Sequence, residues 1–323
     1  MRFIKQLLTG IAAVCAATAV LAQADYPDRP IRMVVPFPAG GGTDILTRNI
    51  ATAITAKLGW TVIVDNKPGA GGNLALDSVA KSKPDGYTML MAQTDNIVMG
   101  GLLYEKLSYD PVKDFEPVAP VARGAAVLAV RADSPYKSLD DVVAGGEANP
   151  GKLTFATPGI GTTPHIFQQL WENVSGIKLT HVPYKGASQA VPDLLGGQVD
   201  MYMGSIPTLR GQIENGKLRG LGVSTSQRAA VLKQVPTFAE SGIQGVELAS
   251  VWGVVAPAGT PKDVVSKWNG AINAALAQPD VRDKILDSGA EILAGTPKQL
   301  GDINAADRNR LGPVIRRANI KLD

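Results

Sequence analysis

Cysteine is almost absent from this chain, and its scarcity excludes two kinds of site. Cys15 is the one cysteine among 323 residues, and it lies in an N-terminal segment that we expect to be removed. The remaining chain then carries no thiol, so it forms neither a disulfide nor a thiolate-bound metal. The two histidines and the scattered acidic residues show no metal-ligand spacing either. We therefore expect no metal and no cofactor.

Aromatic residues are scarce as well, and the chain carries no large excess of charge of one sign. The chain has 32 Lys and Arg against 29 Asp and Glu, which gives a net charge of +3. Removal of Arg2 and Lys5 with the N-terminal segment lowers this charge by two, to about +1. Aromatic residues make up 5% of the chain, and no basic run is interleaved with them. This composition does not support nucleic-acid binding.

Long apolar runs are also lacking, except at the N-terminus. Residues 1–24 begin with the basic Arg2 and Lys5, continue through apolar Leu7–Leu21 and end in the small-residue motif Ala22–Ala24. This order is typical of a cleaved signal peptide. A membrane anchor is the alternative, but the run is short for a spanning helix and rich in small residues. The sequence therefore predicts an exported protein.

What the chain has in quantity is glycine, 35 residues of it, and much of it lies in a recurring local pattern. A short apolar strand leads into a glycine-rich loop and then a helix in Ile31–Asp44, Thr61–Asn73 and Leu153–His165. Such a helix N-terminus offers unpaired N–H groups to an anion without using Lys or Arg. A tight turn is the alternative for any single loop. Three of them at equivalent strand ends favour a ligand site, because open α/β sheets bind ligands there.

The spacing of these glycines excludes the common nucleotide loops. Gly40-Gly41-Gly42 does not match the dinucleotide pattern G-x-G-x-x-G, and no Gly-Lys-Ser/Thr follows any of the loops. No G-x-S-x-G elbow and no nucleophile–base pair can be recognised. We therefore do not expect an enzyme.

Alternating strands and helices with short loops predict an α/β fold with parallel sheets covered on both faces. The expected strands are Ile31–Pro36, Thr61–Asp65, Tyr87–Ala92, Val118–Val130, Leu153–Ala156, Leu179–Pro183, Val199–Met203, Arg219–Ser224 and Leu248–Ala256. The expected helices are Thr43–Leu58, Leu74–Lys81, Thr163–Ser175, Ser188–Leu195, Pro207–Asn215, Pro261–Gln278 and Pro297–Arg317, and Gly101–Pro117 is expected to be irregular. Strands Val118–Val130 and Leu248–Ala256 are expected to cross between two lobes, comprising 25–122 with 249–323, and 123–248. The architecture is then a hinged clamshell.

Several side chains near these loops are candidates for ligand contact. The hydroxyls of Thr157, Thr162 and Thr163, with the N–H groups from Gly161 onward, suit a carboxylate. His165 on the first helical turn is a further candidate, with helix capping or solvent exposure as the alternative.

Three other polar residues have competing interpretations. Asp44 either caps its helix or orders water at the ligand. Arg123, near the first crossing, is the best-placed cation for a second ligand carboxylate, with a surface or hinge salt bridge as the alternative. We expect His181, which lies in a strand, to be structural.

At these residues the chain resembles the Bug family, the TctC-like periplasmic solute-binding components of tripartite tricarboxylate transporters. The resemblance covers nearly all of the sequence after residue 25. Its motifs are YPDRPIRMVVPFPAGGGTD (Tyr26–Asp44), NKPGAGGN (Asn66–Asn73), DGYTMLM (Asp85–Met91), LSYDPVKDFEPV (Leu107–Val118), TPGIGTTPH (Thr157–His165), VPYKGASQAVPDLLGGQVDMYM (Val182–Met203) and WGVVAPAGTP (Trp252–Pro261). One departure is the stretch IVMGGLLY at Ile97–Tyr104, where family members often carry Asn-Pro before Leu-Tyr. The first-lobe wall of the cleft is therefore expected to suit this protein's own ligand.

The resemblance implies a two-lobe Venus-flytrap fold of the type II periplasmic class, with each lobe a mostly parallel sheet flanked by helices. It implies that one ligand carboxylate binds between loops Phe37–Asp44 and Thr157–Thr163, and that the region Gln93–Asp95 lines the cleft. The residues expected to bind the ligand are Phe37, Pro38, Ala39, Gly40, Gly41, Gly42, Thr43, Asp44, Thr94, Arg123, Thr157, Gly161, Thr162, Thr163, His165, Met203 and Gly204.

The function that follows is binding of a small organic carboxylate, a di- or tricarboxylate or an aromatic acid, in the periplasm. A monomer would deliver this ligand to the permease subunits of a tripartite tricarboxylate transporter. One alternative is an exported ligand sensor that signals to a membrane system. Another is an exported enzyme that acts on a carboxylic acid derivative.

Overall fold

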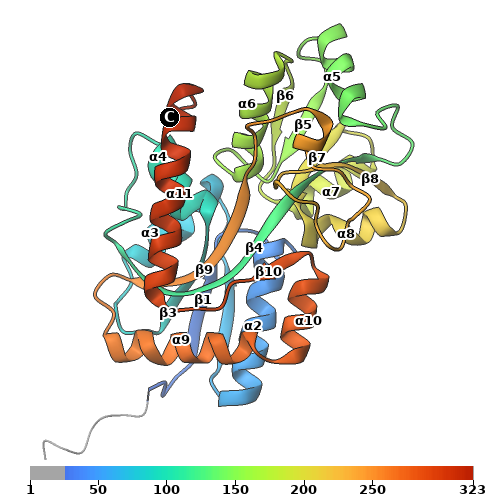
Figure 1. Cartoon of the computed structure of the whole chain (residues 1–323). Helices are drawn as coiled ribbons and strands as arrows, with labels where there is room; N and C mark the ends of the chain where they lie inside the picture. Colours follow the sequence, from blue (N-terminus) through green and yellow to red (C-terminus); the bar gives the residue numbers. More distant parts are fainter. Residues whose placement is uncertain (1–25, 323) are drawn as a thin grey trace, which may run out of the picture.

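The computed structural model describes residues 26–322 and consists of two lobes joined by two long strands (Figure 1). The signal peptide expected at 1–24 lies outside the described residues. Eight strands follow one another across the sheet in the order β2-β1-β3-β9-β4-β7-β5-β6, and β8 and β10 each pair with β4. The predicted α/β, two-lobe fold is confirmed.

We call the lobe that contains β1, β2 and β3 the first lobe. Strand β1 (Ile31–Val35) pairs in parallel with β2 (Val62–Asn66) and with β3 (Thr88–Gln93). Its other elements are α2 (Gly42–Leu58), α3 (Asn73–Ala80), α9 (Lys262–Leu276), α10 (Pro279–Asp287), β10 (Ala290–Ile292), α11 (Pro297–Arg317) and the short turn η2 (Ala70–Gly72). Helix α2 ends at Gly59, whose left-handed φ of 71° suits glycine.

The second lobe repeats this arrangement. Strand β5 (Thr154–Thr157) pairs in parallel with β6 (Thr180–Pro183) and β7 (Met201–Ser205). Its other elements are α5 (Leu139–Ala148), α6 (Thr163–Ser175), α7 (Ala187–Leu195), α8 (Ile206–Glu214), β8 (Leu218–Val223) and the short turn η4 (Ala239–Ser241). The aromatic rings of Phe155, Phe167, Trp171 and Phe238 pack edge to face in its core.

Two strands connect the lobes. Strand β4 (Phe115–Arg131) pairs antiparallel with β9 (Ala249–Pro257) from Phe115 to Ala125, and then with β7 and β8 from Ala126 onward. Both crossing strands lie where the sequence predicted them. The lobe boundaries at 122/123 and 248/249 stay a prediction.

The segment after β3 differs from expectation. A π-helical turn, η3 (Asp95–Met99), leads directly into α4 (Gly100–Leu103), so the stretch expected to be irregular from residue 101 begins as a helix. Gly101 permits close packing there, because a Cβ at this position would lie 2.9 Å from Cγ of Pro111. Helices α5 and α10 and strand β10 were not predicted.

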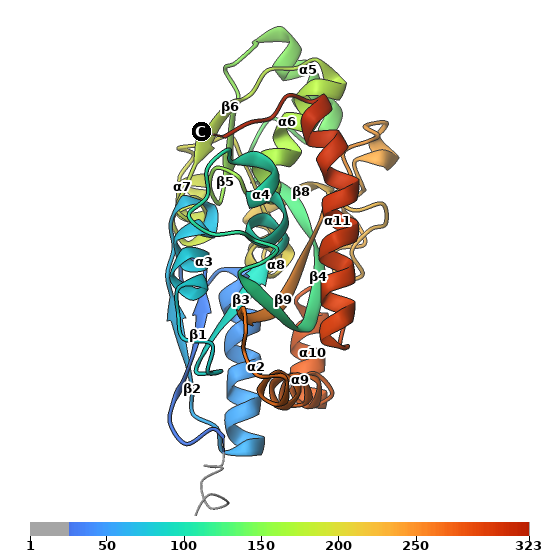
Figure 2. The same ribbon diagram turned by 90° about the vertical axis from the view of Figure 1, so that its left-hand side faces the viewer.

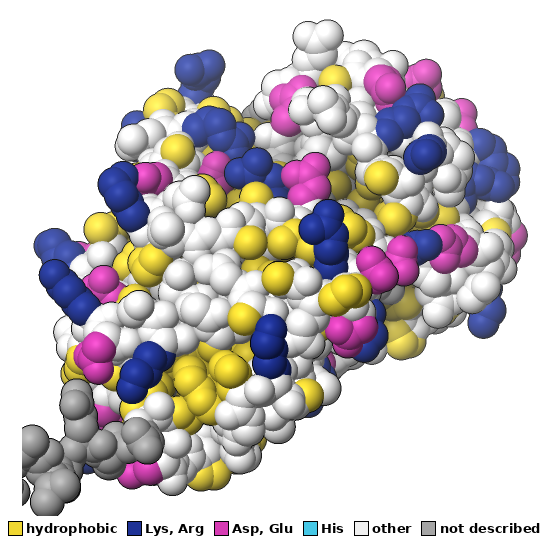
Figure 3. Space-filling view, turned by 60° about the horizontal axis from the view of Figure 1, so that its bottom comes forward, with side chains coloured by type: hydrophobic (Ala, Val, Ile, Leu, Met, Phe, Trp, Pro, Cys, Tyr) yellow, Lys and Arg dark blue, Asp and Glu magenta, His cyan; other side chains and the backbone are white. Residues whose placement is uncertain are grey.

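Helix α11 packs back on the first lobe, as expected for the C-terminal part, and lies alongside β4 (Figure 2). Charged side chains of both signs are interspersed on the face seen from below in Figure 3, which agrees with the nearly balanced composition. Within residues 26–322, no helix combines the length and the apolar character that crossing a membrane requires.

Candidate ligand-binding site

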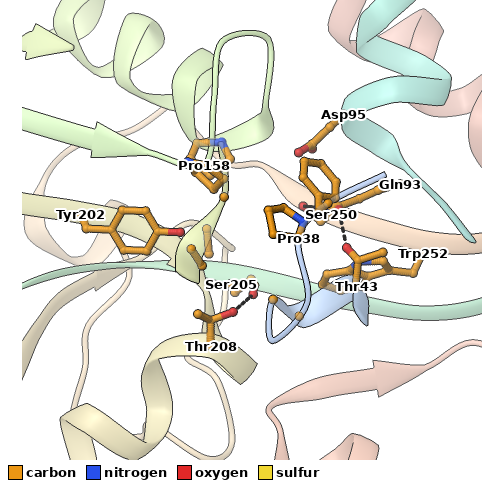
Figure 4. Close-up of a pocket in the computed structure, with 18 residues that line it drawn as sticks. Pro38, Thr43, Gln93, Asp95, Pro158, Tyr202, Ser205, Thr208, Ser250 and Trp252 are labelled. Atoms are coloured by element: carbon orange, nitrogen blue, oxygen red, sulfur yellow. Dashed lines mark hydrogen bonds between the residues drawn. The ribbon is translucent and has the colours of Figure 1, made fainter. Parts of the chain in front are cut away.

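A cavity of about 50 Å³ lies between the lobes (Figure 4). Its lining residues from the first lobe and the crossing strands are Phe37, Pro38, Gly41, Gly42, Thr43, Gln93, Asp95, Ala125, Ala126, Ser250 and Trp252. Those from the second lobe are Pro158, Pro164, Gly186, Ala187, Tyr202, Ser205 and Thr208. A second cavity of about 220 Å³ shares Phe37 and Pro158 with the first, and Lys185 is part of its lining.

The N-terminus of α2 supplies backbone donors to this cavity. Gly41 is its N-cap residue, and no side chain caps the helix. The first N–H groups of a helix have no partner inside it. Since Gly41, Gly42 and Thr43 all line the cavity, these N–H groups and the positive end of the helix dipole are available to an anion there.

Asp44 shapes the loop that precedes α2. Its carboxylate accepts hydrogen bonds from the Gly40 N–H at 2.9 Å, from Arg48 Nε at 3.0 Å and from Asn66 Nδ2 at 2.9 Å. Burial opposes ionisation, but these hydrogen bonds outweigh it and hold the pKa of Asp44 below its usual value. The ionised Asp44 side chain thus stabilises the glycine loop through hydrogen bonds, and it does not line the cavity.

A chain of buried hydrogen bonds holds the N-terminus of α2 in place. Trp252 Nε1 donates to Thr43 Oγ1 at 2.9 Å, and Thr43 Oγ1 donates to Gln93 Oε1 at 2.8 Å. Gln93 Nε2 then donates to Ser250 Oγ at 3.1 Å. All four side chains are buried, so each donor depends on its partner. The network fixes α2 against β3 and β9.

Asp95 forms a contact across the cleft. The Thr163 hydroxyl, at the start of α6 in the second lobe, donates a hydrogen bond to Asp95 Oδ1. Burial raises the pKa of Asp95 to about 6, and the hydrogen bonds from Thr163 offset only part of that effect. Asp95 therefore couples the first lobe to the N-terminus of α6.

Tyr202 presents an unused polar group to the cavity. Its side chain is completely buried, and within residues 26–322 its hydroxyl has no hydrogen-bond partner. In Figure 4 this hydroxyl points from β7 toward the middle of the cavity. An unsatisfied buried hydroxyl costs about 1–3 kcal/mol, so a ligand group that accepts its hydrogen bond is stabilised there.

The two histidines form a stacked pair under the loop between β5 and α6. The rings of His165 and His181 are 4.1 Å apart. His165 Nδ1 accepts from the Gly161 N–H at 3.2 Å, and His181 Nε2 lies 2.7 Å from Thr157 Oγ1. Burial, together with the neighbouring His181, lowers the pKa of His165 to about 3, and burial lowers that of His181 to about 4. Both rings are therefore neutral at physiological pH, and they support the loop.

This pairing predicts sensitivity to acid. The folded-state pKa of His165 is depressed, so its contribution to stability is complete above about pH 6.5 and is lost as the pH falls toward about 3. At about pH 5 the loss is about 2 kcal/mol. In His165→Asn the amide oxygen can still accept from Gly161 but does not titrate, so the fall in unfolding free energy from pH 7 to pH 5 is expected to be smaller by about this amount. Urea denaturation of both proteins measures the difference, and equal falls would refute it.

The structure brings five of the predicted residues to the cavity: Phe37, Pro38, Gly41, Gly42 and Thr43. Ala39 and Gly40 are exposed at the tip of the same loop. Thr94 is not among the residues that line the cavity, and its hydroxyl accepts from the Val251 N–H. Its neighbours Gln93 and Asp95 both line the cavity. Ligand contact by the predicted residues stays a prediction.

The predicted residues of the second-lobe loop build the loop and are not among the residues that line the cavity. The hydroxyls of Thr162 and Thr157 donate to the Gly159 carbonyl at 2.7 Å and 3.3 Å, and the Gly161 N–H donates to His165 Nδ1. Thr163 instead donates to Asp95 of the first lobe. Pro158 and Pro164 form the lining there instead.

Three further predicted residues lie elsewhere. Arg123 is exposed on β4, opposite Glu291 of β10 and outside both cavities. Met203 packs in the core of the second lobe. Gly204 follows it on β7, where the ring of Tyr202 occupies the space that a Cβ would need.

Sequence reasoning missed Tyr202, Ser205, Ser250 and Trp252. Each lies on or directly after a strand that was predicted, but the apolar runs of β7 and β9 do not show which face meets the other lobe. A shift of one residue along a strand exchanges the two faces. The signal that was available is the polar residue in an apolar strand, namely Tyr202 in β7 and Ser250 in β9.

Two α/β lobes that are joined by two strands and enclose a cavity with unused polar groups define a two-lobe solute-binding protein. Comparison with known proteins then identifies the family. The family model described as tripartite tricarboxylate transporter family receptor matches residues 46–320, and the chain belongs to this family. The predicted resemblance to Bug and TctC-like proteins is confirmed.

Individual relatives match over almost their whole length. The UPF0065 protein in the tcbD-tcbE intergenic region of Pseudomonas sp. (strain P51) is 38% identical over 314 residues, 96% of this chain and 93% of that protein. The structure of periplasmic binding protein BugD is 34% identical, with a TM-score of 0.88 over 92% of this chain and 99% of that chain. The structure of R. palustris Rpa4515 with adipate gives the same four values: 34%, 0.88, 92% and 99%.

Proposed function

We propose that this protein is a periplasmic receptor that closes its two lobes on a small organic carboxylate and delivers it to the permease of a tripartite tricarboxylate transporter. The observation that carries the proposal is the cavity between the lobes, which is lined both by the uncapped α2 N-terminus and by Tyr202, whose hydroxyl has no hydrogen-bond partner among residues 26–322. A carboxylate accepts hydrogen bonds from both. Such charge-assisted hydrogen bonds strengthen when closure excludes water.

The comparisons support this role. The family is described as a receptor of tripartite tricarboxylate transporters, and a relative of 34% identity was solved with adipate, a dicarboxylate. Membership of a family of periplasmic receptors also supports the periplasmic location. The proposed rigid bodies are 25–122 with 249–323 and 123–248, which hinge at the two crossing strands. The proposed contacts are the loop Phe37–Asp44, above all its residues that line the cavity, and the loop Thr157–Thr163.

A thermal-shift screen of mono-, di- and tricarboxylates on ligand-stripped protein tests the proposal. A ligand that binds only the folded protein raises the melting temperature with the logarithm of its concentration. The absence of any shift with every acid would contradict the receptor role. Recovery of the bound compound unaltered excludes an enzyme, and uptake by a knockout strain distinguishes transport from signalling to a membrane sensor.

The variant Tyr202→Phe gives a sharper test of the site. Its ligand affinity is expected to fall at least tenfold, because one hydrogen bond to a charged group is lost, worth about 1.5–3 kcal/mol. Without ligand the variant should melt at the wild-type temperature or above it, because within residues 26–322 no protein group forms a hydrogen bond with the removed hydroxyl. Calorimetric titration and thermal melting measure the two quantities. A lower melting temperature with unchanged affinity would make the hydroxyl structural.

A further inference from the structure

The charges around the cavity narrow the class of carboxylate that fits it. Among the described residues that form its lining, none is Lys, Arg or His, and Asp95 is the one carboxylate. The cationic Lys185 belongs to the adjoining larger cavity. A second carboxylate on a short ligand would therefore lie in a cavity whose described lining includes the carboxyl group of Asp95 and no cationic side chain.

Asp95 itself lacks a positive partner. It is 4% exposed, its hydrogen bonds come from the hydroxyl and N–H of Thr163 and from its own N–H, and no ion pair involves it in the described part of the chain. The dipole of α6 stabilises a carboxylate at its N-terminus by about 0.3–1 kcal/mol, up to about 2 when partly buried. Burial of an unpaired charge costs several kcal/mol, so the dipole does not offset it. The raised pKa of Asp95 has the same cause. Buried charges in proteins are normally paired, and here the missing partner is a cation.

The other side of the same cavity favours the opposite charge. There the uncapped N-terminus of α2 and the buried, unpartnered hydroxyl of Tyr202 both offer hydrogen bonds to an anion. Figure 4 shows Tyr202 and Asp95 reaching the cavity from different elements, one from each lobe. The cavity thus combines an anion-binding end with a buried carboxylate.

We propose that the ligand is a small zwitterion with one carboxylate and one ammonium group, and that Asp95 selects it by facing the ammonium. This inference rests on the proposed receptor function and specifies its ligand class. The carboxylate binds at the α2 N-terminus with Tyr202. A short dicarboxylate is disfavoured, because its second carboxylate would share the cavity with Asp95 and find no cationic side chain among the described lining residues.

Calorimetric titration of ligand-stripped protein with a matched series tests the proposal at neutral pH. Butyrate, 2-aminobutyrate, 4-aminobutyrate and succinate share a four-carbon chain and differ in charge. The better of the two amino acids is expected to bind at least tenfold tighter than butyrate, and succinate more weakly than butyrate. Adipate and 6-aminohexanoate repeat the comparison with a six-carbon chain, and the amino acid is again expected to bind tighter.

Two other outcomes would contradict the proposal, and they distinguish a wrong role for Asp95 from a wrong receptor function. If a dicarboxylate binds tighter than its amino-acid counterpart, or if all members bind equally, the selection by Asp95 is wrong while the receptor function stands. If none of these acids and no acid in the thermal-shift screen binds, the receptor function fails as well.

The variant Asp95→Asn tests the residue itself. The amide oxygen can still accept from Thr163, so the contact across the cleft is kept while the charge is removed. The ratio of amino-acid to butyrate affinity is expected to fall at least fivefold, and succinate should bind more tightly than it does to the wild type. Asp302→Asn, on the exposed side of α11, removes the same charge far from the cavity and should leave both affinities unchanged. An unchanged ratio in Asp95→Asn would refute the role of Asp95.

Discussion

Replacement of Gly42 by alanine is expected to weaken ligand binding about tenfold or more while leaving the ligand-free protein as stable as the wild type. Gly42 belongs to the first lobe and Ser205 to the second, and a Cβ at Gly42 would lie 2.5 Å from Oγ and 3.3 Å from Cβ of Ser205. The extra methyl group therefore acts as a wedge between the lobes. Overpacking of this kind costs about 1–3 kcal/mol, and 1.4 kcal/mol is a factor of ten in affinity.

The effect is confined to the closed state. In the proposed hinge opening, Ser205 of the second lobe separates from α2, so the added methyl group is no longer compressed. The measurements are ligand affinity by calorimetry, stability by denaturation, and closure by small-angle scattering with and without ligand. Gly270→Ala in α9, where nothing lies within 4 Å of the added Cβ, is the matched control. Adding Ser205→Ala to Gly42→Ala should restore part of the affinity; full loss in the double variant would disprove the wedge.

The second large effect is expected on stability. Thr43→Val keeps the shape of the side chain but removes the hydroxyl that accepts from Trp252 Nε1 and donates to Gln93 Oε1. Two buried polar atoms then lose their partners, at about 1–3 kcal/mol each. We expect the unfolding free energy to fall by about 3 kcal/mol.

Thr43→Ser is the control for this variant, because it retains the hydroxyl and loses only a methyl group. Its cost should stay near 1 kcal/mol, the scale of one buried methylene group. Denaturant titrations of the three proteins measure both values. If the valine and serine variants are equally stable, the hydrogen-bond chain does not support the α2 N-terminus.

The sequence predicts a helix well where the residues that typically begin and end helices are present at its two ends. Helix α6 runs from Thr163 to Ser175 as predicted, because Thr162 precedes it, Pro164 lies in its first turn, and Gly176 ends it in the left-handed conformation. Helix α11 was also predicted to the residue. Its Thr296 and Gln299 form a capping box. These signals are local, so no tertiary information is needed to read them.

The turn after β3 had no such signal. A π-helical turn at Asp95–Met99 has no recognised sequence pattern, and it determines that Asp95 reaches the second lobe. The candidate site was likewise predictable only in part. The glycine loop before α2 is a local motif, whereas the opposing wall depends on which face of β7 meets the cleft. The roles of Thr157 and His165 inside the loop depend on a ring stack with His181, a residue from another strand.

The pairing of β4 with β9 constrains how this protein can open. The two strands that join the lobes are hydrogen-bonded to each other from Phe115 to Ala125, so neither can swivel alone like a flexible linker. The ladder is also held within the first-lobe sheet, because β3 pairs with β9 from Trp252 to Val255 and β10 pairs with β4 from Ala122 to Gly124. We therefore expect any hinge motion to bend or twist the two crossing strands together, beyond Ala125, where β4 leaves β9 and pairs with β7 and β8.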